Sequence, residues 1–568
     1  MIKKKDVSRT LCETSKEYIK KLTQANDKKT IKTKQSKTSN TSNKNTYTKY
    51  NNYIKKIVKS FVNSQHTLLD TIFKIKNECQ FDITYKEEMI YNNTNTTNTT
   101  NTTNNTNNTN NTNNTNKTNN TNNTNTTYTI PPFIDIFRYL ITINEFISQF
   151  TLEEQKILIE NLNNNKTKED CYIFLDTSPI GKKLLSIYNT LMYNNSSLYN
   201  NVLIKFPSIK FHSLLINSFT SYKILEDLET NIKKVIVFSI QWKGVKLDNI
   251  IYLFIYDNET FDTHKEILNL GREIIKRLLF FNEFLNTNKY PDRFILFLTD
   301  KKKEIDKELI EQLHFKTINI NTAVTNTKDI IIYRKEELFK SIFHECIHFH
   351  NLDFRTVSQT LLNTIINYLI KTHNIDSNND YLLYECVTET LANVLNTIYY
   401  SGDIKNMSIN LETEILFSTL QVSKILKICN YKQWTDFSLD NKINNNTKNK
   451  NTNTNNTLTI KKTINRKTLK KQFKQDSCVY SYYILKLYIL LNLSTYFDTI
   501  IDNKLKFIET EETFNKLIKL FDVSRTNLIL KEIINSMLKG LYLEDKTNKN
   551  INKKTLRMTC LESNIFTK

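Results

Sequence analysis

Glycine is scarce in this sequence, with five residues among 568, and no two of them lie close together. Loops that cradle phosphate, of either the dinucleotide or the P-loop type, need several glycines in one turn, so we exclude both. Cysteine is present but dispersed, and none of the eight forms a CxxC pair. This spacing argues against a thiolate zinc site and against a dense disulfide framework.

Long apolar segments are also missing. The N-terminus, MIKKKDVSRTLCETSKEY, has no apolar region of the kind found in a signal peptide. The most apolar run, residues 480–493, is short and contains Lys486, so we expect a buried helix there and no membrane span. These features predict an intracellular, cytoplasmic protein.

The net charge of +21 suggests at first a nucleic-acid or membrane-surface partner, but its distribution argues otherwise. Residues 1–50 carry 14 basic and 4 acidic side chains, and residues 441–475 carry 10 basic and no acidic ones. The rest of the chain is therefore nearly neutral. We expect the two basic segments to be solvated and to bind nucleic acid weakly at most.

Composition divides the chain into segments. Residues 92–127 are Asn and Thr apart from Lys117, and such a tract has no apolar side chains to offset the entropy of ordering. The predicted segments are a basic disordered tail with a helical part (1–91), an Asn/Thr linker (92–128), a globular core (129–440), a basic low-complexity linker (441–475) and a C-terminal helical region (476–568).

The core changes pattern partway along, from helical spacing to short apolar runs typical of strands. Strands are predicted at VIVFSIQW (235–242), IIYLFIYD (250–257), FILFL (294–298) and IIIY (330–333), with a helix at about 261–286. The last strand runs directly into a helix that contains several histidines. This order predicts an α+β fold in which a small sheet precedes the histidine helix.

Residues 341–354 read SIFHECIHFHNLDF and place three of the chain's eight histidines within seven residues. In a helix, His344 and His348 at positions i and i+4 project from one face, so both imidazoles can reach one metal ion. Glu345 is turned by about a third of a circle, where it can accept a proton from water beside the ion. This is the HExxH spacing. A chance match is the competing interpretation, and the strand before the motif argues against it.

A third ligand is expected from the helix predicted in YLLYECVTETLANVLNTIYYSG, residues 381–402. Glu385 and Glu389 are also at i and i+4, so both can face the histidine helix. One would bind the metal, and the other would hydrogen-bond a ligand imidazole and fix its tautomer. The residues alone leave open which glutamate has which role.

With HExxH followed by Glu385-Cys-Val-Thr-Glu389, the sequence resembles the gluzincin branch of the zincin metallopeptidases. The resemblance implies that Glu385 is the third zinc ligand and Glu389 its supporting residue, with Glu where the family usually has Asp. It also implies a small mixed sheet whose edge strand binds extended peptide, and 330–333 is the candidate edge. The metzincin branch fits less well, because it needs His or Asp at position 354, which is Phe, and Asp353 is one residue off.

The same resemblance implies zinc-dependent hydrolysis of a peptide or protein substrate. Zn²⁺ held by His344, His348 and Glu385 would lower the pKa of its water toward about 7, and Glu345 would act as general base. A His/His/Glu set would also accept other divalent ions, so the residues do not fix the metal.

The group that stabilises the oxyanion is not identified by any motif. Tyr480, Tyr482 and Tyr483 are candidates, although a tyrosine-rich amphipathic stretch is more often part of a core, and His373 is a further candidate. His350 is two residues after His348 and faces another side of the helix, so we expect it to be structural.

Two other classes of function stay open. One is a catalytically inactive zincin-fold protein with a structural or binding role, for example in a virion, since the Asn/Thr tracts resemble the composition of large DNA virus proteins. The other is a nucleic-acid-binding protein that uses the basic segments, which the near-neutral remainder argues against. Hydrolysis of a peptide library with a chelator control separates a peptidase from the inactive form.

Overall fold

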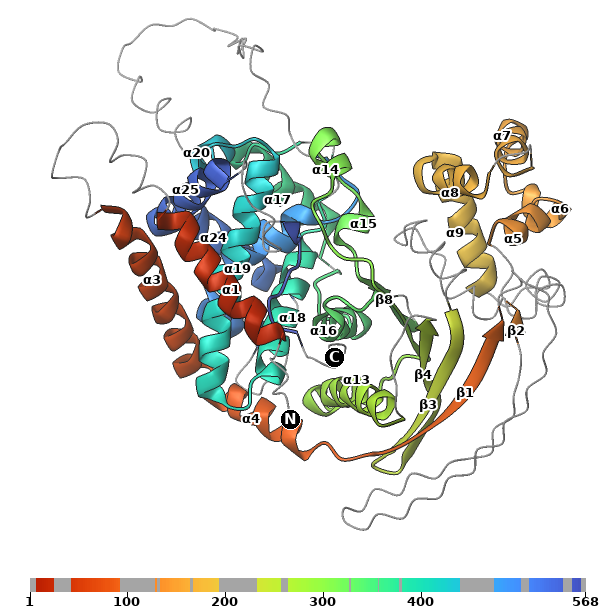
Figure 1. Cartoon of the computed structure of the whole chain (residues 1–568), viewed down its shortest axis with the longest axis horizontal. Helices are drawn as coiled ribbons and strands as arrows, with labels where there is room; N and C mark the ends of the chain where they lie inside the picture. Colours follow the sequence, from red (N-terminus) through yellow and green to blue (C-terminus); the bar gives the residue numbers. More distant parts are fainter. Residues whose placement is uncertain are drawn as a thin grey trace, which may run out of the picture.

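A computed structural model shows how the chain is arranged (Figure 1). It describes residues 7–24, 42–91, 128–129, 133–163, 167–193, 232–256, 264–325, 328–355, 357–376, 379, 381–439, 474–501, 510–544 and 554–562. The two predicted linkers lie outside the described residues, apart from residue 128 in a short strand and residues 474 and 475 in another.

A seven-stranded mixed sheet organises the fold, with strand order β2-β1-β3-β4-β5-β8-β7. The strands are β1 (Asp82–Tyr91), β2 (Tyr128–Thr129), β3 (Ile232–Trp242), β4 (Val245–Tyr256), β5 (Arg293–Thr299), β7 (Ala323–Thr325) and β8 (Asp329–Arg334). β4, β5 and β8 run parallel, whereas β3 and β7 pair antiparallel with their neighbours β4 and β8. The four predicted strands correspond to β3, β4, β5 and β8, and the predicted α+β class is confirmed.

Both faces of the sheet are buried, which explains why its central strands read as continuous apolar runs. In β5, Phe294 and Leu296 face one hydrophobic core, and Ile295 and Phe297 face the other. Successive side chains of a strand point to opposite faces, so each strand contributes to both cores.

The edge strand differs from the prediction. β8, the predicted edge at 330–333, is internal, because β5 pairs with one side of it and β7 with the other. The edge is β7, only three residues long. A segment this short has no alternation that sequence analysis can detect.

The helix that carries HExxH lies between the sheet and the helix that carries the two glutamates. α16 (Leu338–Phe349) contacts β7, β8 and α13 (His264–Leu285) on one side and α18 (Tyr384–Tyr400) on the other (Figure 1). Every residue of α16 is buried. These contacts hold the histidine helix between the sheet and α18.

The remaining helices lie on both sides of the sheet (Figure 1). They are α1 (Val7–Gln24), α3 (Ser42–Ser64), α4 (His66–Glu78), α5 (Phe133–Leu140), α6 (Asn144–Ile147), α7 (Leu152–Asn163), α8 (Lys168–Thr177), α9 (Pro179–Tyr193), α14 (Lys307–Gln312), α15 (Thr317–Ile320), α17 (Gln359–Thr372), α19 (Ile404–Ile428), α20 (Trp434–Phe437), α22 (Lys486–Leu490), α23 (Leu493–Ile500), α24 (Glu511–Arg525) and α25 (Leu528–Leu543). Two short strands, β6 (His314–Phe315) and β9 (Lys474–Gln475), pair with each other, and Tyr480–Leu485 forms a π-helical turn, η2.

The predicted N-terminal segment 1–91 contributes helices to the fold. α1 and α3 lie within it, and both pack on α19 and α25. Tyr18, Ile19 and Leu22 are fully buried on one face of α1. A narrow apolar stripe of this kind is enough to hold a helix when a partner surface covers it.

None of the helices in the described part of the chain has the length and apolar composition to cross a bilayer.

Candidate metal centre

The two imidazoles of the HExxH motif lie side by side on α16. Their ring centroids are 4.7 Å apart, and Nε2 of His344 lies 3.1 Å from Nε2 of His348. The i, i+4 spacing in the helix produces this approach. Both side chains are largely buried.

Glu385 of α18 completes a triangle with these two nitrogens. Its Oε2 atom lies 3.4 Å from Nε2 of His344 and 3.2 Å from Nε2 of His348. Zinc bonds of about 2.0–2.1 Å in tetrahedral directions separate ligand atoms by about 3.3 Å. The three predicted ligands thus form a buried group that could hold a metal ion.

Each imidazole also forms a hydrogen bond with a carboxylate through its Nδ1 atom. Nδ1 of His344 lies 3.0 Å from Oε2 of Glu389, and Nδ1 of His348 lies 2.5 Å from Oδ2 of Asp353. A hydrogen bond at Nδ1 leaves the Nε2 lone pair for a metal ion and orients the ring. The structure thus places Glu385 at the cluster and Glu389 behind it, as the resemblance implied.

The charges around the imidazoles shift their pKa values. Burial acts against protonation of His348, but Glu385 and Asp353 outweigh it and raise the pKa to about 10. Burial acts against ionisation of Glu385, yet the two histidines hold its pKa well below the usual range. These carboxylates favour the protonated imidazole of His348, so a cation that binds at Nε2 competes with a proton.

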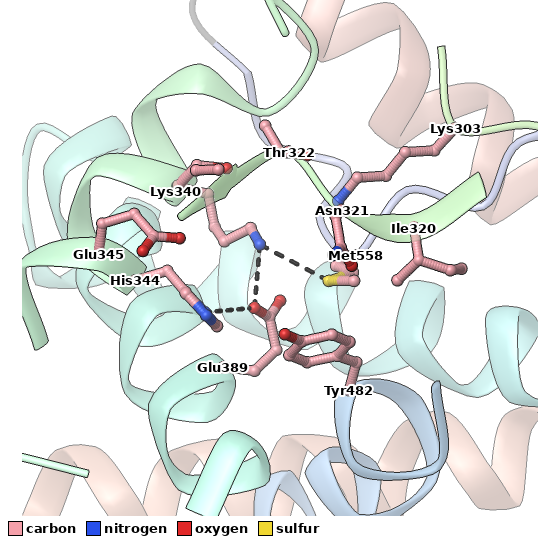
Figure 2. Close-up of a pocket in the computed structure, with 12 residues that line it drawn as sticks. Lys303, Ile320, Asn321, Thr322, Lys340, His344, Glu345, Glu389, Tyr482 and Met558 are labelled. Atoms are coloured by element: carbon pink, nitrogen blue, oxygen red, sulfur yellow. Dashed lines mark hydrogen bonds and ion pairs between the residues drawn. The ribbon is translucent and has the colours of Figure 1, made fainter. Parts of the chain in front are cut away.

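Two buried lysines lie within ion-pair distance of Glu389. Nζ of Lys340 lies 2.9 Å from Oε2 of Glu389, and Nζ of Lys486 lies 3.7 Å from Oε1. Figure 2 shows Lys340 and His344 converging on the same carboxylate. Burial acts against ionisation of Glu389, but Lys340 and the His344 imidazole hold its pKa well below the usual range.

Glu345, the predicted general base, lies beside the imidazole pair. Its carboxylate accepts a hydrogen bond of 2.5 Å from the hydroxyl of Thr325 in β7, and that hydroxyl also lies 3.2 Å from the Glu345 carbonyl oxygen. The edge strand therefore fixes the rotamer of Glu345.

A cavity of about 340 Å³ opens onto the three ligand side chains and Glu345. Residues 323–325 of β7 line one wall, and Tyr384 and Tyr482 line others. A smaller cavity of about 30 Å³ continues past Glu345 and Tyr482 toward Lys340 (Figure 2). The larger volume is in the range of cavities that bind small molecules or peptide side chains.

Of the predicted oxyanion donors, Tyr482 is the one that lines these cavities. Its ring centroid is 5.8 Å from that of His344. Tyr483 instead donates to the carbonyl oxygen of Leu556, and Tyr480 packs against His373. All three hydroxyls have pKa values raised well above the usual range, above all by burial.

Two other histidines lie apart from the cluster. His373 hydrogen-bonds Tyr488 through Nε2 at 2.9 Å and lines neither cavity. His350 stacks on Phe281 at 5.9 Å, consistent with the structural role expected of it.

Sequence reasoning missed three contributors to the site: Asp353, Thr325 and Lys340. Asp353 was considered only as a displaced ligand, and its position five residues after His348 is the signal that could have identified it. Nothing in the local sequence distinguishes Thr325 or Lys340 from surface residues.

Comparison of this chain with protein-family models, with curated proteins and with solved structures finds no match.

Proposed function

We propose that this chain is a zinc-dependent peptidase of the zincin type. The observation that carries the proposal is the convergence of His344, His348 and Glu385 on one point at the wall of a cavity, with Glu345 adjacent. The three side chains would hold Zn²⁺, and the ion would supply a water of lowered pKa for attack on a carbonyl carbon.

Glu345 is placed to accept a proton from that water and to deliver it to the leaving amine. Its carboxylate is buried, and the Thr325 hydroxyl holds one oxygen in place. The second oxygen makes no hydrogen bond to a described residue, so it is available for the proton. To accept the proton and then to deliver it, the Glu345 side chain must lie beside the metal-binding cluster, and it lines the same cavity as that cluster.

Tyr482 is the group we assign to the oxyanion. Its ring borders the cavity beside His344, and its hydroxyl makes no hydrogen bond to a described residue. Burial raises the pKa of this hydroxyl, so the O–H remains a donor at neutral pH. A donor aimed at the developing negative charge typically contributes about 10²–10³ in rate.

The edge strand β7 would bind the substrate backbone. In the described part of the chain it pairs with β8 alone, and its residues 323–325 line the cavity. An extended peptide can add to such an edge by main-chain hydrogen bonds. This placement, antiparallel to β8 and next to the HExxH helix, supports assignment to the zincin type.

The test is hydrolysis of a peptide library by the purified full chain. We expect cleavage that a chelator abolishes and Zn²⁺ restores. Glu345→Gln should lower the rate by more than about 10³-fold and leave zinc affinity nearly unchanged, because this residue moves protons and does not bind the ion. Glu311→Gln, on an exposed helix surface, is the matched control and should behave as the unaltered chain.

Full activity in Glu345→Gln would contradict the assigned mechanism. Tight zinc binding without hydrolysis of any library member would contradict the peptidase proposal and identify the chain as a metal-binding protein without this activity.

A further inference from the structure

The C-terminal tail, which we define as residues 554–562 (KTLRMTCLE), passes through the interior of the fold. Leu556, Met558, Cys560 and Leu561 are each at most 3% exposed. The tail forms a single isolated bridge with Glu304 and is not a strand of the main sheet. A buried extended segment must have its backbone polar groups paired by other means.

Carboxylates of the surrounding helices bind the N–H groups of the tail. Glu337, at the N-cap of α16, accepts hydrogen bonds from the backbone nitrogens of Met558 and Thr559, the second at 2.7 Å. Glu414 of α19 accepts from the nitrogens of Cys560 at 2.8 Å and Leu561 at 3.0 Å. Carboxyl oxygens thus pair the consecutive N–H groups of residues 558–561.

Cationic and amide side chains bind the carbonyl oxygens of the tail. Lys486 donates to Met558 at 2.8 Å, and Lys424 donates to Thr555 at 2.8 Å. Asn393 of α18 donates to the same Met558 oxygen at 3.0 Å. The surrounding helices thus pair both the N–H groups and the carbonyl oxygens of the tail, as a peptide-binding groove does.

One of these receptor groups, Glu414, depends on the tail for its hydrogen bonds. Glu414 is 1% exposed, and among the described residues it has no cationic partner at ion-pair distance. Its bonds are to Thr559, Cys560 and Leu561 of the tail. Burial raises the pKa of the Glu414 carboxyl, and a buried carboxyl oxygen without such hydrogen bonds would be unfavourable.

One tail residue lies directly behind the metal centre. Met558 contacts both lysines that neutralise Glu389: its sulfur is 3.7 Å from Nζ of Lys340, and its carbonyl oxygen accepts from Lys486. Glu389 in turn bonds Nδ1 of His344. Figure 2 shows Met558, Lys340, Glu389 and His344 in one continuous chain of contacts.

We propose that the groove between α16, α18, α19, η2 and α22 is an internal peptide-binding site. Its ligand is an extended peptide recognised through its backbone and through its buried side chains, supplied by the chain's own residues 554–562. Occupancy of this groove positions Lys340 and Lys486 against Glu389 and thereby sets the affinity of the metal centre. The effect on metal affinity rests on the proposed function, whereas binding of the tail in the groove does not.

The experiment uses the full chain with a protease recognition sequence inserted between Glu544 and Lys554, cut after folding. The control carries the same insertion within residues 441–473, so that its cut leaves the tail covalently attached to the adjoining helices. Retention of the released fragment is measured by gel filtration, and zinc affinity by competition with a chromophoric chelator. The fragment is then removed in dilute urea, and the synthetic nonapeptide KTLRMTCLE or a scrambled peptide is added.

We expect the fragment to stay bound to the cut chain and zinc affinity to match that of the control. Removal of the fragment should lower zinc affinity at least tenfold, as loss of groups that orient a ligand usually does. The nonapeptide should restore it, and the scrambled peptide should not. In the cut chain, Glu414→Ala should release the fragment faster, because it removes the oxygen that accepts hydrogen bonds from Thr559, Cys560 and Leu561.

Free separation of the fragment from a folded cut chain would overturn the proposal, as would unchanged zinc affinity after its removal. If removal unfolds the chain, recovery of the fold with the nonapeptide supports the proposal, and failure to recover overturns it. If the uncut chain binds no zinc, the proposed function fails, and fragment retention still decides whether the groove binds the tail.

Discussion

At the scale of single residues, the two imidazoles are supported by carboxylates that reach them by different routes. Glu389 comes from α18, whereas Asp353 comes from the turn directly after α16. The backbone of Asn351 and Phe354 is left-handed, with φ values of 56° and 59°, and Asp353 lies between them. This uncommon backbone brings the Asp353 carboxylate back beneath its own helix.

The support from Asp353 can be tested by one isosteric change. Asp353→Asn keeps the shape and removes the negative charge behind His348, so zinc affinity should fall about 10- to 100-fold. Competition with a chromophoric chelator measures this. Asp300→Asn is the control, because that side chain is 81% exposed, and it should have no effect. An unchanged affinity in Asp353→Asn would show that this carboxylate does not tune the centre.

A second residue-scale prediction concerns the oxyanion donor. Tyr482→Phe should lower kcat by about 10²–10³-fold and leave zinc affinity and KM nearly unchanged, because the hydroxyl acts only as charge develops. The neighbouring Tyr480→Phe is the control, since its hydroxyl is buried without a hydrogen-bond partner in the described structure. Equal losses in the two variants would exclude a specific role for Tyr482.

The ligand residues could be predicted because their spacing is local. His344, Glu345 and His348 lie within one helical turn, and Glu385 and Glu389 repeat the same interval. Which tyrosine faces the site could not be predicted, because Tyr480, Tyr482 and Tyr483 occupy a π-helical turn. In that turn side chains do not follow the 100° steps of an α-helix.

At the scale of elements, the edge of the sheet decides where substrate could lie. β8 was predicted from four apolar residues, and a strand buried on both faces has that pattern. β7 has only three residues and, among the described strands, pairs with β8 alone, so its existence depends on the strand beside it. The sequence therefore predicted β3, β4, β5 and β8 but not β1, β2 or β7, and it assigned the edge one strand too far inward.

Addition of a peptide to β7 would alternate bonded and unbonded residues along the substrate. In a substrate series with one N-methyl group at successive positions, we expect kcat/KM to fall about fivefold to tenfold at every second position. The measurement is a steady-state rate for each peptide. A uniform or absent effect across positions would contradict binding along this edge.

At the scale of the whole molecule, one hydrophobic core joins segments that the sequence separates. Buried side chains of α1, α13, α16, α18, α19 and α25 belong to the same cluster. Arg557 of the C-terminal tail lies 2.7 Å from Glu336, although these two residues are 221 positions apart in the sequence. No local pattern encodes such contacts, so the tail's position could not be predicted from the sequence.

Stability of the whole fold should depend on pH through a buried histidine. Burial, and then the charge of Arg525, lowers the pKa of His373 to about 3. The unfolded chain, with a pKa near 6.5, binds this proton first, so stability is full above about pH 6.5 and falls as pH drops toward 3, by a few kcal/mol. Urea unfolding across this range measures the effect, with a chelator present throughout. Glutamine in His373→Gln cannot titrate, so the free energy of unfolding of this variant should fall less steeply as pH drops. An equal dependence on pH in the variant and the unaltered chain would contradict this.

The central claim is that three side chains hold one metal ion, and anomalous diffraction at the zinc edge tests it most directly. In crystals of the full chain with Zn²⁺, the account predicts one strong peak about 2.0–2.2 Å from Nε2 of His344, Nε2 of His348 and a carboxylate oxygen of Glu385, with a fourth position open to the cavity. Absence of a peak between these atoms, or a dominant peak elsewhere, would contradict it.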